Sequence, residues 1–458
     1  MSRAVAADRR QLTEAQDSAF DWHGRRLGHD PGQLRGDAEL VSWPCMPSVT
    51  ALRALAAATP EQRRRRQRVF FGPSIAIRRS IGQGIHDRLE AAAFADGQIS
   101  PEDETWASRH FPFPTRILSV RCRQVRSHSI WDLSVRGEHW GLDDRDDIMN
   151  VVNIGSLHLA PGAIVTVRGN LLILIVQRLI CDSGASGAAG QLAILPTPFS
   201  VDSGTGPLHG ASGLTGRDGA DGTDGTAAPT AATWLGPRLT GPVVPGACDG
   251  RDGGDATAGG DGTKGRTGGA SKLAEITIGE LTGTLTVVAT AGRGGDGGGG
   301  GDGGRGGHGG RGAPGQRTLQ GLLPPGRGGH GGRGGHGGRG GHGGHGGIAS
   351  NIFVSLPPEA AGRLRVLSHP APGGRGGQGG HGGAGGAPGG HRGTDGARGR
   401  NGRTRPAPPV FVNELPVEPM TAPAEVPAPG AVPSLDTRRG APPSTVLATS
   451  STTGGERQ

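Results

Sequence analysis

Arginine and histidine occupy every third position between Gly326 and Gly347, and the two positions between them are glycine throughout. Guanidinium groups donate paired N–H bonds to phosphates and carboxylates, while imidazole can carry a proton or bind a metal. The row therefore predicts contact with a polyanion or another acidic partner. Its candidate contact residues are Arg327, Arg333, Arg339, His330, His336 and His342.

The same spacing argues against a metal site in this row. A backbone with three residues per turn rises ~3.1 Å per residue, so neighbouring histidines on one ridge lie about 9 to 18 Å apart. Ligands of one metal ion must come within ~2.0 Å of it, which only histidines from two adjacent helices could achieve. We predict no metal and no cofactor.

Two further motifs could hold a hard cation, and both are weak. The run Ala95–Ser100 is similar to the middle of a calcium-binding loop, but Ala92 and Phe94 stand where the first two oxygen ligands belong. The acidic run Asp143–Asp147, beside Trp140, is more typical of a solvated turn.

No arrangement of residues predicts catalysis. A polysaccharide-cleaving groove would need paired carboxylates, but the strands expected between residues 111 and 200 carry Arg, Thr and Ser instead. Four cysteines lie far apart without a CxxC pair, which indicates free thiols. The basic cluster Arg63–Arg66 with Arg68 could bind nucleic acid, although a solvated helix face is the more common role. We predict a protein that is not an enzyme.

Glycine content limits the fold. The 458 residues include 91 Gly and 35 Pro, only 3% are aromatic, and tyrosine is absent, so one large packed core is excluded. A period of three with two glycines matches the left-handed polyproline II helix, whose bare ridges let neighbouring helices approach closely. We expect Gly292–Gly315 and Arg327–Gly347 to run antiparallel in an ordered bundle, which is slightly favoured over disorder, with Gln316–Gly326 as their link.

Other stretches carry glycine only at every third position, as in Gly213–Gly225 and Gly390–Gly402. These triplets resemble bacterial collagen-like and glycine-rich repeat surface proteins, and the Gly-Gly-X runs resemble the polyglycine II bundles of phage tail-tip adhesins. The resemblance implies a structural or adhesive protein. Proline is nearly absent from the triplets and strands interrupt them, which argues against a long collagen rod.

Apolar alternation begins near Pro114 and predicts strands, most clearly over Leu157–Gly169 and Leu171–Cys181. Since Leu171–Val176 is apolar at every position, both of its faces must be covered. Strand pairs recur at 275–291 and 351–367, each followed by a glycine-rich excursion. The predicted fold is mainly β: an irregular β-solenoid or β-sandwich base with projecting glycine-rich polyproline II-type loops.

Helical periodicity at Ser48–Ala58 and Ile75–Phe94 predicts a small N-terminal helical region, and the Pro-rich stretch Thr404–Gln458 predicts a disordered tail. The predicted division is a helical region 1–110, strand modules 111–203, 271–291 and 348–370, glycine-rich regions 204–270, 292–347 and 371–403, and a tail 404–458.

Charge suggests how the glycine-rich regions interact. Residues 204–270 are acidic and residues 292–403 are basic, so the two regions are expected to face each other. No signal peptide or membrane span is visible, which predicts a cytoplasmic protein or one exported by a non-classical route.

The leading functional prediction is a non-enzymatic structural or adhesive protein that displays rows of Arg, His and Asp. The alternative is an RNA- or DNA-binding protein with flexible RGG-like segments, and a groove enzyme comes third. The expected partner is a surface, a polysaccharide or an acidic polymer. Nucleic acid is less favoured because there is no Phe, Trp or Tyr between Arg293 and Gly347 to stack on bases.

Overall fold

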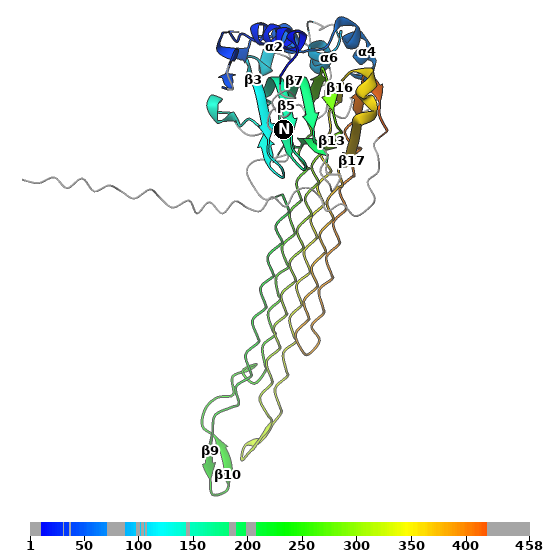
Figure 1. Ribbon diagram of the computed structural model, residues 1–458. Helices are drawn as coiled ribbons and strands as arrows, with labels where there is room; N and C mark the ends of the chain where they lie inside the picture. The colour runs from blue at the N-terminus through cyan, green and yellow to red at the C-terminus, as the bar shows by residue number, and fades with distance from the viewer. Residues whose placement is uncertain are drawn as a thin grey trace, which may run out of the picture. The chain divides into compact units, whose positions relative to one another are not determined.

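The computed structural model describes residues 11–30, 32–35, 38–70, 88–97, 101, 105, 108–142, 147–182, 189–197 and 208–418. These residues belong to one unit, Met1–Met420, and they form a β base from which glycine-rich segments project (Figure 1). The prediction of a mainly β fold is confirmed.

Two sheets of mostly parallel strands make up the base in the described part of the chain. The main path of the larger sheet is β1 (Leu40–Ser42), β3 (Phe113–Val125), β5 (Met149–Leu159), β7 (Leu171–Cys181), β11 (Ala274–Ile278), β16 (Ile352–Ser355), β18 (Val410–Val412) and β19 (Leu415–Pro416); β2 (Cys45–Met46) pairs with β3, and β12 (Leu281–Thr282) with β7. The smaller sheet consists of β17 (Leu364–His369), β13 (Leu285–Thr290), β8 (Gly190–Leu195), β6 (Ile164–Arg168) and β4 (Ile130–Asp132).

The recurring strand modules are present, but their two strands do not pair with each other. In the second module β11 belongs to the larger sheet and β13 to the smaller sheet. Each pairs in parallel with its counterpart from the next module, Ala274 opposite Ile352 and Leu285 opposite Leu364. Successive modules therefore add one strand to each sheet, in chain order.

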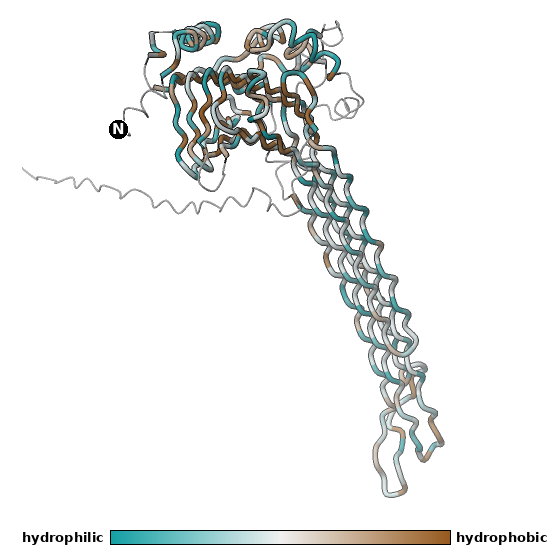
Figure 2. Tube along the Cα trace, turned by 45° about the vertical axis from the view of Figure 1, so that its right-hand side comes forward, coloured by the Kyte–Doolittle hydropathy of each residue, from teal (hydrophilic) through white to brown (hydrophobic). Residues whose placement is uncertain are grey.

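Strand β7 shows how the central strand is covered on both faces. Leu172, Leu174 and Val176 pack between the two sheets, whereas Leu171, Ile173 and Ile175 pack against the N-terminal helices. Figure 2 shows the hydrophobic residues concentrated in these layers. The prediction that Leu171–Val176 must be covered on both sides is confirmed, and the helical region supplies one of the two covers.

Four α-helices lie in the described N-terminal ranges: α2 (Glu14–Arg26), α3 (Val49–Leu55), α4 (Pro60–Phe70) and α6 (Arg88–Phe94). The short 3-10 turns are η1 (Gln33–Arg35), η2 (Ser108–His110), η3 (Gly137–Trp140) and η4 (Pro358–Arg363). Thr13 and Gln16 form a capping box that begins α2, and Ser48 caps α3. The helix predicted over Ile75–Phe94 is described only at α6. None of the described helices is both long and apolar enough to cross a bilayer.

The basic cluster Arg63–Arg66 was predicted to be a solvated helix face. This prediction is wrong for Arg66. The Arg66 side chain is fully buried, and its guanidinium contacts Glu275 at 2.6 Å and Glu414 at 3.0 Å. It also lies 4.4 Å from the centre of the Phe353 ring. A buried charge needs such partners because removing an ion from water costs roughly several kcal/mol. Arg66 therefore links α4 to the larger sheet through buried ion pairs.

The prediction of a disordered tail from Thr404 is wrong for the described residues at its start. Val410–Val412 forms β18, which pairs in parallel with β16 and extends the larger sheet. Phe411 stacks on Phe353 with ring centres 5.3 Å apart, so an apolar cluster outweighs the surrounding prolines. The rest of the predicted tail, residues 419–458, lies outside the described residues.

Candidate interaction surface

The glycine-rich excursions form a shaft that leaves the base (Figure 1). Backbone hydrogen bonds join six extended segments within it. We number them in chain order: segment I is 208–226, II is 248–269, III is 292–313, IV is 326–347, V is 372–387 and VI is 390–403. Hydrogen bonds to a given neighbour recur every three residues, which is the period of a polyproline II-type helix.

The six segments lie in two layers. Segments I, III and V form the odd layer and run parallel, since Gly216 N–H donates to the carbonyl of Asp302 and Gly303 N–H to that of His381. Segments II, IV and VI form the even layer, also parallel. Hydrogen bonds between the layers join antiparallel segments, as Gly338 N–H to Gly301 O illustrates. The predicted antiparallel arrangement of Gly292–Gly315 and Arg327–Gly347 is confirmed.

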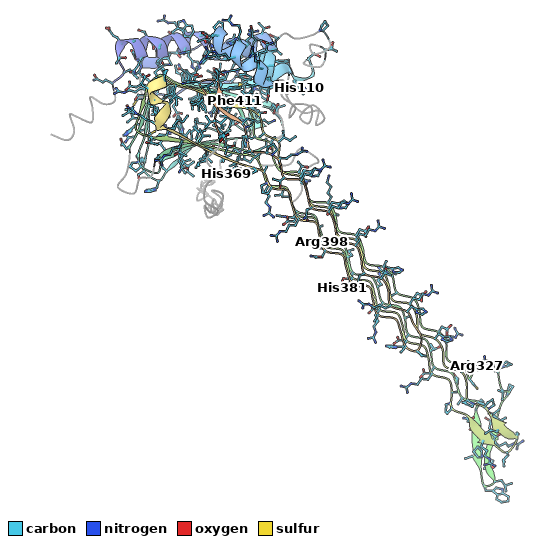
Figure 3. All side chains as sticks on the ribbon, turned by 90° about the vertical axis from the view of Figure 1, so that its right-hand side faces the viewer. His110, Arg327, His369, His381, Arg398 and Phe411 are labelled. Carbon is cyan, nitrogen blue, oxygen red and sulfur yellow. The ribbon has the colours of Figure 1, made fainter. Side chains whose placement is uncertain are left out.

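Glycine content follows the number of neighbours. Segments I and VI each bond to two other segments and carry one glycine per triplet, whereas III and IV each bond to four and carry two. A Cβ on Gly301 would lie 2.0 Å from the Leu214 carbonyl oxygen, and one on Gly300 would lie 2.0 Å from that of Gly338. The third residue of each triplet points outward, so the shaft's side chains line its surface (Figure 3).

Every aspartate of the shaft accepts a backbone hydrogen bond from an adjacent segment. The donor N–H groups lie 2.6 to 2.7 Å from the carboxylate oxygens. The aspartates are Asp218, Asp221, Asp224, Asp249, Asp252, Asp255, Asp261, Asp296, Asp302 and Asp395. In nine of these bonds the donor N–H belongs to an outward-pointing Arg or His, and the carboxylate supplies the acceptor that this N–H needs. The tenth donor, to Asp395, is Gly382.

The acidic and basic regions therefore meet, although mainly through backbone N–H groups. Asp249 and Asp252 bond to the N–H groups of Arg327 and His330, whose side chains extend away. Among the described shaft residues the arginine ion pairs are Arg293–Asp296 and Arg392–Asp395, each within one segment. The carboxylates stabilise the shaft and leave most guanidinium groups exposed.

Acid is expected to weaken the shaft. The N–H of Arg375, helped by the charges of Arg293 and His209, lowers the pKa of Asp296, and the N–H of Gly382 lowers that of Asp395. A lowered pKa stabilises the fold above the ordinary Asp pKa, and this stabilisation is lost as pH falls through the lowered value. Calorimetry from pH ~6 to ~2, a range that brackets the ordinary Asp pKa of ~3.9, should show a falling unfolding temperature. A temperature that stays constant or rises would contradict the assignment.

Histidine performs the same structural task as aspartate at several positions. The Nδ1 atoms of His336 and His342 accept the N–H groups of Thr394 and Arg400, at 3.0 and 2.9 Å. Because a backbone N–H can only donate, Nδ1 is unprotonated and Nε2 carries the hydrogen. These rings therefore direct an N–H donor outward.

All six predicted contact residues lie on segment IV with exposed side chains: Arg327, His330, Arg333, His336, Arg339 and His342. They form one row on the outer surface of the even layer, and Arg327 lies at its distal end (Figure 3). The structure thus brings the predicted set together along a line and not into a pocket.

Sequence reasoning missed the distal end of the shaft. Two hairpins, β9 (Thr230–Thr233) with β10 (Gly236–Leu239) and β14 (Gln316–Thr318) with β15 (Gly321–Leu323), pack together there, and Leu319 N–H donates to Pro237 O at 2.9 Å. Their large apolar side chains are exposed: Trp234, Leu235, Leu319 and Leu322. Trp234 is 91% exposed. The presence of this tryptophan inside a glycine-rich region of the sequence was the signal that could have indicated an exposed apolar tip.

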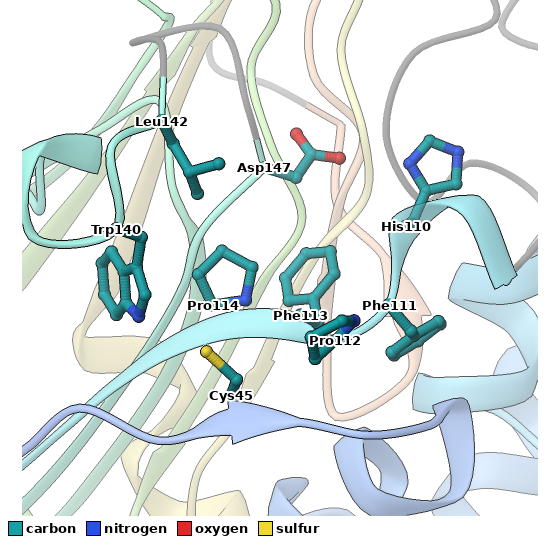
Figure 4. A pocket seen from close by; sticks show the side chains of 9 residues that line it. All are labelled: Cys45, His110, Phe111, Pro112, Phe113, Pro114, Trp140, Leu142 and Asp147. Atoms are coloured by element: carbon teal, nitrogen blue, oxygen red, sulfur yellow. The ribbon is translucent and has the colours of Figure 1, made fainter.

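A cavity in the base is lined by aromatic and proline side chains at and just before the start of β3 (Figure 4). Its volume is about 340 Å³, and Cys45, Trp140 and Asp147 are among its lining residues. Asp147 is buried and paired with Lys272. The predicted acidic turn is therefore partly an internal ion pair, and its residues 143–146 lie outside the described residues.

The remaining predicted motifs show no ligand chemistry. Asp96 of the calcium-like run pairs with Arg53 at 2.7 Å, and residues 98–100 lie outside the described residues. All four cysteines are free, as predicted, and burial raises the pKa of Cys181 to about 12. Among the described residues, no group of three or more His, Cys, Asp or Glu could hold a metal ion.

Comparison with known proteins gives no further guide to function. No family model matches the chain, and no curated protein and no solved structure is significantly similar to it.

Proposed function

We propose that this chain is a non-enzymatic structural or adhesive protein whose shaft presents side-chain rows and an apolar tip to a partner. The β base, which we interpret as an irregular solenoid built from successive strand modules, would hold the shaft. The observation that carries the proposal is the shaft itself: most of its glycines face inward, its long side chains face outward, and it ends in hairpins that expose Trp234.

Several contacts support a rigid shaft over the flexible RGG-like alternative. Segments III and IV are bonded to four neighbours each, through glycines that leave no room for a Cβ. The strand registers also continue into the shaft. β16 lies 78 positions after its partner in β11, Ile352 opposite Ala274, and segment IV keeps the same offset from segment II, since Arg327 N–H bonds to Asp249. The base thus sets the alignment of the shaft.

Spin labels on segment III test rigidity directly. Arg293→Cys and Arg311→Cys lie at exposed outward positions 18 residues apart, and Cys45, Cys122 and Cys248 would be replaced by serine. A polyproline II-type segment predicts a narrow distance distribution near 56 Å, at ~3.1 Å per residue. A flexible glycine-rich chain of that length would average only about 23 Å with a broad distribution. The short, broad result would refute the shaft function.

A further inference from the structure

The even layer of the shaft carries unpaired cations near the base. Lys264 of segment II, His342 of segment IV and Arg400 of segment VI share one level, since Gly265 N–H donates to His342 O and Gly343 N–H to Arg400 O. Arg339 and Arg403 flank this level along the shaft. Lys264, Arg339, Arg400 and Arg403 carry a positive charge, and all five side chains are exposed. We call these five residues the proximal cation patch.

The patch offers hydrogen-bond donors only. Asp261, the one neighbouring carboxylate in the even layer, already accepts the N–H of Arg339 at 2.6 Å. The Nδ1 of His342 accepts the N–H of Arg400, so its Nε2–H is the ring group left to donate at the level of Lys264 and Arg400. No ion pair joins Lys264, Arg400 or Arg403 to any described residue. An anionic group placed here would meet ammonium, guanidinium and imidazole donors together.

Charge spacing indicates which anion fits. Outward residues recur every three positions, about 9 Å apart along a segment. Phosphates of a nucleic acid strand recur every ~3.4 Å, far more densely than the patch can match. The distal half of the same face also carries Asp249, Asp252 and Asp255, which would repel a dense polyanion. The shaft segments contain no Phe, Trp or Tyr on which bases could stack.

We infer that the proximal cation patch binds a linear acidic polysaccharide, with one sparse carboxylate or sulfate group seated at Lys264, His342 and Arg400. The polymer would lie along the even layer, where hydroxyl groups can bond to the mixed Asp, Arg and His surface further from the base. This inference rests on the proposed function, since only an ordered shaft brings segments II, IV and VI to one level.

Two triple variants with equal charge change test the inference in the full chain. The first is Lys264→Gln, Arg400→Gln and Arg403→Gln on the even layer. The matched control, Arg305→Gln, Arg311→Gln and Arg375→Gln, lies on the odd layer. All six positions point outward, so backbone bonds are retained. Binding of fluorescent chondroitin sulfate and hyaluronate oligosaccharides is followed by anisotropy at low and physiological salt.

The first variant should bind these oligosaccharides at least about tenfold more weakly, a difference of ~1.4 kcal/mol, while the control binds like the parent. Equal losses in both variants would show general charge attraction and overturn the inference, as would no binding by the parent. Tighter binding of single-stranded DNA that depends on the same residues would assign the patch to nucleic acid instead. Amide exchange on the same samples separates a failed shaft, with unprotected segments, from a protected shaft that does not bind.

Discussion

Gly301→Ala is expected to remove amide protection from the shaft, whereas Gly299→Ala, two positions away, should leave it intact. The Cβ added at position 301 would lie 2.0 Å from the Leu214 carbonyl oxygen, which itself accepts the N–H of Gly260. The clash therefore forces segments I, II and III apart. Overpacking of this kind costs ~1 to 3 kcal/mol or more, and a backbone acceptor has no alternative rotamer with which to relieve it.

Gly299 is the matched control because it occupies an outward position of the same segment. A Cβ there would meet nothing closer than the Ser212 hydroxyl at 3.7 Å. Alanine also restricts the unfolded chain, which can stabilise a protein by ~0.4 to 1 kcal/mol. Amide exchange of peptides within residues 292–313 measures both variants. Equal loss of protection in the two would mean that segment III is not packed as described.

Insertion of one glycine after Gly337 should disorder the distal part of segment IV, while insertion of a whole Gly-Arg-Gly triplet at the same point should not. One residue shifts Arg327, His330 and Arg333 out of phase, so side chains point into spaces that accept only glycine. The backbone bonds to segments II, III, V and VI are lost together, at roughly 1 kcal/mol net for each bond. The expected destabilisation of the shaft is therefore several kcal/mol.

A triplet preserves the phase and moves each contact by one level. Asp252, which accepts the N–H of His330, would then accept that of Arg333. Protection of peptides from residues 248–269 and 326–347 reports the outcome, with peptides from 157–181 in the base as an internal reference. If the single insertion were tolerated as well as the triplet, the three-residue packing period would be refuted.

The sequence predicted the repetitive elements of the fold well. The period of three identified which residues of segment IV point outward, and the uniform apolar run Leu171–Val176 required covers on both faces. Both inferences depend on local spacing, which the sequence displays directly. The antiparallel course of segments III and IV followed from the short link between them.

Contacts between residues far apart in the sequence could not be predicted from local spacing. Nothing local marks Arg66 as the buried member of an arginine cluster, because its partners Glu275 and Glu414 lie more than 200 residues away. Assignment of each module's two strands to different sheets likewise depends on pairing between modules. The use of aspartate as a backbone acceptor became visible only once adjacent segments were aligned, since an exposed Asp is ordinary in any loop.

The constant offsets between strands and shaft segments bear on how the chain folds. In the smaller sheet Leu285 pairs with Leu364, 79 positions later, and Arg375 N–H bonds to Asp296 across the same interval. Closing loops of this length before any contact forms is entropically slow. Strand pairing in the base brings the segment roots together in register, after which each further triplet can add its bonds next to those already made. The shaft is then expected to assemble from the base toward the tip, and to lose its order in the opposite direction when heated.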